Sequence, residues 1–145
     1  MKKILAALTM VGILTCSGMA FASPNSDLLA KEEKASVTVV EAFAGQGEYN
    51  SAAKYFTEAR KKATDSLAFR KAKAEITKSF GELKEVKFVA LEKFKNNDRL
   101  TYLASYTKAP IVKVVLLFKV DGKDVKLANF GFTQINQQAK PQNKK

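Results

Sequence analysis

The chemistry open to this chain is narrow, because it contains no histidine and its one cysteine is Cys16. Without histidine, Ser-His-Asp and Cys-His nucleophiles and histidine-ligated metals are excluded. Carboxylate chemistry remains, because Tyr102 and Tyr106 share one strand parity and Glu92 and Asp98 are nearby in sequence. A buried carboxyl and a tyrosine donor can act as base and oxyanion partner in a lyase or isomerase. The alternative is that both tyrosines are core or rim residues and Glu92 lies on an exposed edge.

Cofactor-binding motifs are also missing from the sequence. The segment Gly45-Gln46-Gly47 lacks the following glycine of a phosphate-cradling loop and does not follow a strand. The segment Asp121-Gly122-Lys123-Asp124 is too short and too poor in acids for a calcium loop. We therefore expect no cofactor and no metal, and a non-catalytic module rather than an enzyme.

Basic side chains form the other candidate site. Lysine and arginine total 25 against 14 acidic residues, a net charge of +11, which attracts anionic partners over about 8–10 Å. Two runs on expected helices form a candidate anion-binding surface, comprising Arg60, Lys61, Lys62, Arg70, Lys71 and Lys73. The alternative is a pair of solvated helix faces. Nucleic-acid binding is not expected, because it favours aromatics among the cations and Tyr55 is the one nearby candidate.

The N-terminal residues have the three parts of a secretory signal. Lys2 and Lys3 precede an apolar run at residues 4–14, and Ala20-Phe21-Ala22 is an A-x-A cleavage site. The apolar run is shorter than the roughly 20 residues that span a bilayer, so we expect cleavage near Ala22 and no integral membrane anchor. Lipidation at Cys16 is the alternative, although Thr15 before it fits poorly. The mature protein is then periplasmic or secreted.

The remaining chain is long enough for one domain with its own core, residues 23–135. Residues 136–145 contain Gln, Asn, Pro and Lys but no apolar anchor, and predict a disordered basic tail. Loss of Lys2 and Lys3 lowers the net charge from +11 to +9.

Helical periodicity dominates the first half of the domain. The first expected helix, from residue 25 or 26, ends at Gly45-Gln46-Gly47, and has an apolar face of Leu29, Val37, Val40, Phe43 and Ala44, with Glu32 elsewhere. The second, capped by Asn50, has the stripe Ala52, Phe56, Ala59 and Ala63. The third starts at Thr64 or Asp65, ends at Gly81, and has the stripe Phe69, Ala72, Ile76 and Phe80.

After Gly81 the apolar period changes to two, which predicts strands. Val86, Phe88 and Ala90 alternate in the first, and residues 99–107 and 111–120 form the next two. Asp121-Gly122 predicts a hairpin, and the fourth strand, residues 125–135, changes parity, which predicts a bulge near Asn129 or Gly131. Val115 and Leu117 suggest partial burial of the second sheet face by a pocket, a dimer contact or sheet curvature. The fold class is α+β: N-terminal helices packed on a curved four-stranded antiparallel meander.

This order resembles the nuclear transport factor 2-like superfamily of cystatin-like α+β cones, and within it a family of small exported bacterial domains whose function is uncharacterised. The resemblance covers about residues 26–135. It rests on Phe43, Gly47-Glu48-Tyr49-Asn50-Ser51-Ala52-Ala53-Lys54-Tyr55-Phe56, Phe80-Gly81-Glu82-Leu83-Lys84, Val114-Val115-Leu116-Leu117-Phe118, Asp121-Gly122-Lys123 and Phe130-Gly131-Phe132. It implies a concave sheet and helices that enclose an apolar pocket. The superfamily includes isomerases, dehydratases, cyclases and binding modules, so the fold does not choose a function.

The function expected from the sequence is that of an exported binding or interaction module. It holds a small apolar ligand or self-associates as a homodimer through the sheet, and Tyr102, Tyr106, Leu116 and Phe118 are the expected pocket residues. The alternative is a basic envelope protein that docks on anionic surfaces such as lipopolysaccharide or lipid head groups. A lyase or isomerase is the third hypothesis.

Overall fold

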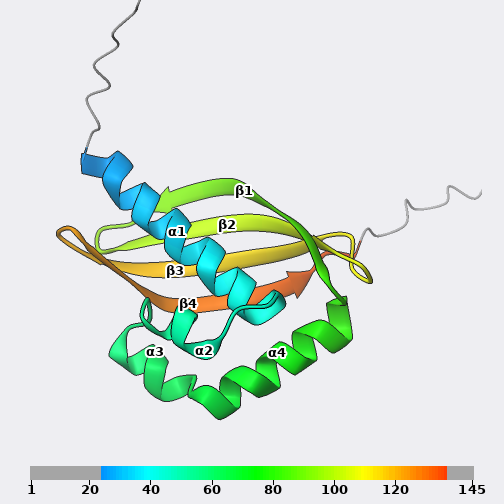
Figure 1. Ribbon diagram of the computed structural model, residues 1–145. Coiled ribbons are helices and arrows are strands. Elements are labelled where there is room, and N and C mark those ends of the chain that lie inside the picture. Colours follow the sequence, from blue (N-terminus) through cyan, green and yellow to red (C-terminus); the bar gives the residue numbers. More distant parts are fainter. Residues whose placement is uncertain (1–23, 137–145) are drawn as a thin grey trace, which may run out of the picture.

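The computed structural model describes residues 24–136 (Figure 1). The predicted signal peptide, residues 1–22, and the predicted basic tail beyond Asn136 lie outside the described residues. Four helices come first: α1 (Pro24–Ala44), α2 (Tyr49–Ala53), α3 (Glu58–Ala63) and α4 (Ser66–Phe80). Four strands follow: β1 (Leu83–Lys93), β2 (Asn97–Tyr106), β3 (Val112–Asp121) and β4 (Asp124–Gln134). They form one antiparallel sheet in the order β1-β2-β3-β4, so the predicted α+β meander is confirmed.

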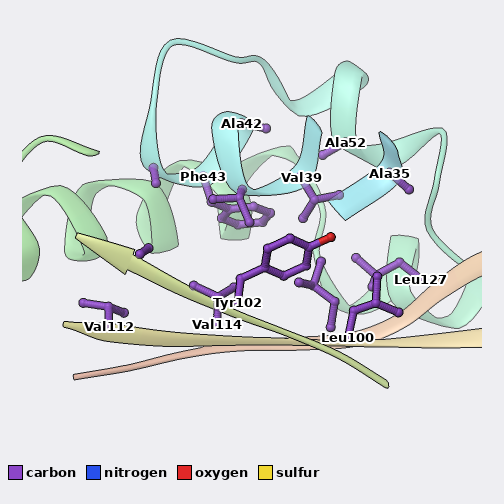
Figure 2. Close-up of a cluster of buried hydrophobic side chains, with 14 of the residues drawn as sticks. Ala35, Val39, Ala42, Phe43, Ala52, Leu100, Tyr102, Val112, Val114 and Leu127 are labelled. Atoms are coloured by element: carbon purple, nitrogen blue, oxygen red, sulfur yellow. The ribbon is translucent and has the colours of Figure 1, made fainter. Parts of the chain in front are cut away.

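Helix α1 lies across one face of the sheet, while α2, α3 and α4 lie on its β4 side (Figure 1). The core is closed between α1 and the sheet, where Val39 and Phe43 lie over Leu100, Tyr102 and Val114 (Figure 2). Alternate residues of β2 and β3 point toward α1, and their burial follows the two-residue period that the sequence shows. No helix among residues 24–136 is long and apolar enough to cross a membrane.

The predicted apolar face of α1 is rotated from the one that packs. Ala35, Val39, Val40 and Phe43 are buried, together with Glu32, whereas the side chain of Val37 is 43% exposed. The expectation that Glu32 lies off the buried face is therefore wrong. Each helical residue advances about 100°, so Glu32, Val39 and Phe43 share a face that Val37 cannot join.

The single helix predicted over residues 50–63 is wrong, because the chain forms α2 and α3 with an extended link between them. In that link Phe56 pairs as an isolated parallel bridge with Leu127 of β4. The Leu127 amide donates to the Tyr55 carbonyl (2.7 Å), and the Thr57 amide donates to the Leu127 carbonyl (2.9 Å). Thr57 then caps α3, its side chain accepting from the Arg60 amide. This pairing to β4 outcompetes two helical turns, and it leaves Ala59 exposed.

Register shifts re-aim side chains on both edge strands. In β4, Asn129 pairs with Leu117 and Leu127 with Phe118, so Ala128 is the bulged residue, beside the predicted position at Asn129. A second irregularity lies between Phe88 and Ala90 of β1. Phe88 pairs with Tyr102 on the inner face but Ala90 pairs with Thr101, so the expected alternation of Val86, Phe88 and Ala90 ends at this shift.

Candidate functional site

An apolar groove of about 330 Å³ opens between α4 and the C-terminal part of β4. We call it the α4–β4 groove. Its wall on α4 comes from Ala72, Ile76 and Phe80, its floor and opposite wall from Phe43, Phe130 and Phe132, and Glu75, Ser79 and Gly131 complete the lining. The groove therefore combines three elements that are distant in sequence.

Aromatic packing builds the floor. The Phe43 ring is fully buried, and its centroid lies 4.7 Å from that of Phe130 and 6.4 Å from that of Phe132. On the far side Phe43 packs edge-on against Phe69, at 4.7 Å. Phe130 and Phe132 pair with Leu116 and Val114 of β3, so the groove floor continues the inner face of the sheet beyond the cover of α1.

Helix α4 is held at both ends but is incompletely covered along its apolar face. Asp65 caps its start by accepting from the Ala68 amide at 2.8 Å. Gly81 ends it with φ +80°, and a Cβ there would lie 2.0 Å from Oγ1 of Thr107, so only glycine fits this close approach. Within the predicted stripe, Phe69 is buried, whereas Ala72, Ile76 and Phe80 are half-buried. These three half-buried side chains form the wall of the groove on α4.

The polar groups of the groove lie among its exposed residues. Glu75 is the one ionisable side chain among the described residues that line it, and Ser79 is the one hydroxyl; both are exposed. A site built this way suits burial of apolar surface with a polar end near the opening.

The four predicted pocket residues do not converge on one pocket, because Phe118 pairs with Asp98 near the start of β2 whereas Tyr106 ends that strand. Tyr102, Tyr106, Leu116 and Phe118 are all buried in the core between α1 and the sheet, and none of them lines the α4–β4 groove. Tyr106 comes nearest, since its ring centroid is 5.4 Å from that of Phe80 on the groove wall. The residues that line the groove were visible in the sequence as the α4 stripe and the alternation of Phe130 and Phe132.

The two predicted carboxylates face opposite sides of the sheet. Glu92 is exposed and forms a two-point ion pair with Arg99 on the outer face, and this hydrogen bonding lowers the pKa of Glu92. Asp98 is buried on the inner face, where it accepts a hydrogen bond from Lys93 at 2.6 Å. Glu92 and the inward tyrosines therefore cannot act on one substrate, and neither carboxylate lines the α4–β4 groove.

A buried polar cluster beneath α1 was not predicted from the sequence. Glu32 is fully buried near Asp98, and desolvation, followed by the Asp98 carboxyl, raises the pKa of Glu32 to about 7. One turn later Ser36 lies beside the hydroxyl of Tyr102, whose pKa is raised by burial. No hydrogen bond of good geometry reaches the Glu32 oxygens or the hydroxyls of Ser36, Tyr102 and Tyr106 within residues 24–136. The i, i+4 spacing of Glu32 and Ser36 was the available signal.

Half of the side chains in the predicted anion surface make hydrogen bonds or ion pairs within the protein. Arg60 donates to the Ala128 carbonyl (3.0 Å) and to the Asn129 side chain, which ties α3 to β4. Lys61 pairs with Glu58, and Lys73 donates to the Gly47 carbonyl at 2.7 Å. The remaining members, Lys62, Arg70 and Lys71, are exposed.

The outer face of the sheet has a shallow hollow of about 320 Å³. The half-buried side chains of Val115 and Leu117 line it beside Arg99, Asn129 and Gly131. Within residues 24–136 no cluster of three or more Cys, Asp or Glu side chains could hold a metal ion.

Comparisons with known proteins leave the family open. No protein-family model matches the chain, and no curated protein matches it. Among solved structures, the chain is similar to the solution structure of a SEC-C motif containing protein from Rhodopseudomonas palustris, with 9% sequence identity and a TM-score of 0.38. That alignment covers 76% of this chain and 78% of the other. The resemblance to the nuclear transport factor 2-like superfamily therefore stays a prediction.

Proposed function

We propose that the protein is a non-catalytic binding module that holds a small apolar molecule in the α4–β4 groove. The observation that carries this proposal is the half-burial of Ile76, Phe80, Phe130 and Phe132 around one hollow, above the fully buried Phe43. A ligand that covers these half-exposed aromatic rings removes apolar surface from water. This burial favours binding by about 25 cal/mol for each Å² of apolar surface.

The size of the groove limits the ligand. A volume of about 330 Å³ lies at the lower end of the range for small-molecule sites. Glu75 and Ser79 then face the ligand's polar end, if it has one, so a neutral or hydrogen-bonding end fits better than an anionic one.

The setting of this function is proposed from the first 22 residues of the sequence. The signal-like pattern of Lys2, Lys3 and Ala20-Phe21-Ala22 supports action in the periplasm or outside the cell. Helices beside a curved sheet with an apolar hollow between them also suit the proposed place in the nuclear transport factor 2-like superfamily, whose members include binding modules.

The test fills the groove from α4. Ala72 is half-buried on the groove wall, whereas Ala74 is exposed two residues away on the same helix. We expect Ala72→Phe to weaken binding of the neutral fluorescent probe N-phenylnaphthylamine by about tenfold or more. The matched variant Ala74→Phe retains the wild-type affinity, and circular dichroism checks that both fold.

Native mass spectrometry of the protein purified without refolding supplies the second readout. A reproducible extra mass on the wild type and on Ala74→Phe, absent from Ala72→Phe, identifies a resident ligand of the groove. Equal probe affinity in all three proteins, or a ligand-free dimer whose interface Ala72→Phe disrupts, contradicts the proposal.

A further inference from the structure

A second hollow, at the opposite end of β4, is lined by lysines. Lys31 and Lys34 come from α1, Lys54 follows α2, and Lys123 and Lys126 come from the β3–β4 turn and the start of β4. We call this hollow, of about 470 Å³, the lysine groove. None of its lysines belongs to the two basic runs that the sequence singled out, because its members are separated by as many as 95 residues, from Lys31 to Lys126.

The backbone brings these lysines together. The parallel bridge between Phe56 and Leu127 fixes the chain after α2 beside the start of β4. As a result Lys126 Nζ reaches the Lys54 carbonyl at 3.0 Å. Across the groove, Lys31 Nζ donates to the Lys123 carbonyl at 2.8 Å, so α1 is tied to the tight turn whose Gly122 has φ +58°. Regular backbone structure therefore brings the five exposed lysines to one hollow, and two of their ammonium groups are held by backbone carbonyls.

The lining of the groove carries more positive than negative charge, although Glu58, which lies outside the lining, interacts with Lys126. Asp124 is the one carboxylate in the lining, against five lysines, which leaves four positive charges. The ion pairs found within residues 24–136 involve Lys61, Lys87, Lys93 and Arg99, and none of the five groove lysines. Lys31 and Lys126 each donate one hydrogen bond to a backbone carbonyl, which carries no formal charge. Like charges that line one hollow repel one another, and an anion relieves that repulsion.

We propose that the lysine groove binds a small anion with two phosphoryl groups. A ligand with two phosphate monoesters carries about −3 to −4 charges near neutral pH, which is opposite in sign and similar in size to the excess of four positive charges in the lining. Lysine ammonium groups are suited to phosphate as compact point charges. The site is concave, with the Tyr55 ring and Val125 between the lysines, which suits a compact ligand that enters it better than a flat bilayer surface.

This site is independent of the proposed apolar ligand. The lysine groove uses Val125 and Lys126 of β4, whereas the α4–β4 groove uses Phe130 and Phe132. Failure of either experiment therefore leaves the other proposal standing.

Calorimetric titration with pyrophosphate tests the proposal. The double variant Lys34→Glu/Lys123→Glu reverses two exposed groove lysines, and the side chain of neither makes a contact that its loss would break within residues 24–136. We expect a loss of pyrophosphate affinity of about tenfold or more at low salt. The matched double variant Lys62→Glu/Lys71→Glu changes the net charge equally at exposed positions on α3 and α4, and it should retain affinity within about twofold.

Three further measurements sharpen the result. Inorganic phosphate, with one phosphoryl group, should bind more weakly than pyrophosphate, and raising salt from about 0.1 M to about 1 M should weaken both. Equal losses in the two double variants would assign the binding to net charge and overturn the proposal, as would no pyrophosphate binding by the wild type. Sedimentation with vesicles of phosphatidylcholine and phosphatidic acid separates the two sources of phosphate. Vesicle binding without pyrophosphate binding overturns the proposal in favour of a membrane surface.

Discussion

The apolar space between the helices and the sheet is closed beneath α1 and open beside α4. Beneath α1, Phe118 and Leu116 have no exposed surface. Beside α4, Phe132 and Phe80 belong to the same continuous apolar layer but remain half-buried around a groove. The residue types are the same in both regions. The difference is that α1 crosses the sheet, whereas α4 lies on its β4 side and contributes a wall rather than a lid (Figure 1).

The two regions therefore divide stability from binding. Residues of the closed region gain their free energy from neighbours within the protein, and their removal leaves a cavity. Residues of the open region still contact solvent, so part of their free energy is available to a ligand. Matched substitutions in the closed and the open region test this division.

The largest expected effect comes from the same truncation in each region. We expect Phe118→Ala to lower the free energy of unfolding by about 4 kcal/mol, because the fully buried ring leaves a cavity. We expect Phe132→Ala to lower it by about 1–2 kcal/mol, because the half-buried ring already borders open space. Urea unfolding measures both. Equal losses would mean that the groove is closed in solution and would remove the contrast.

The closed region contains a buried carboxyl group, Glu32, whose ionisation should make the stability of the protein depend on pH. Burial raises the pKa of Glu32 from 4.5 to about 7, helped by Asp98 and opposed by Lys93, with Tyr102 on the same face. The folded state therefore binds this proton more tightly than the unfolded state. The stability penalty is absent below pH 4.5, grows between pH 4.5 and 7, and is complete above about 7. A shift of this size corresponds to the order of 3 kcal/mol.

The variant Glu32→Gln tests this linkage. Glutamine is close in shape to the neutral carboxyl but cannot ionise, so we expect it to match the wild type at acidic pH and to exceed its stability by the order of 3 kcal/mol above pH 7. Chemical unfolding across this pH range measures the difference. The adjacent Glu33→Gln, at a half-buried position, should follow the wild-type curve. Parallel curves for Glu32→Gln and the wild type would show that Glu32 does not titrate in this range.

The smallest expected effect lies where the two regions meet. Tyr106 packs against Phe80 of the groove wall, its hydroxyl is buried without a hydrogen-bond partner in the described chain, and burial raises its pKa to about 12. Tyr106→Phe removes an unsatisfied polar group, and we expect a gain of about 1 kcal/mol in unfolding free energy. Tyr102→Phe should gain less, since the Tyr102 hydroxyl lies beside Ser36. A loss in Tyr106→Phe would instead identify a bound water as the missing partner.

Local signals predicted much of the fold because they act over a few residues. The two-residue alternation of β2 and β3, the hairpin at Gly122, the cap at Asp65 and the helix end at Gly81 all appear where expected. They failed where a distant partner intervened. The link at Phe56 is extended because Leu127 offers it a strand partner, and no local preference contains that information.

The amino-acid sequence is enough to predict the fold class, to exclude histidine chemistry and to locate the apolar stripes that become the closed core and the groove wall. Tertiary structure alone decided which stripe is covered, since that depends on whether a helix crosses the sheet or lies beside it. It also decided that Glu32 is buried, and that lysines as distant in sequence as Lys31 and Lys126 line one hollow. Periodicity reports how one element is patterned. Burial and charge convergence are properties of several elements packed together, and they arise only when the whole chain has folded.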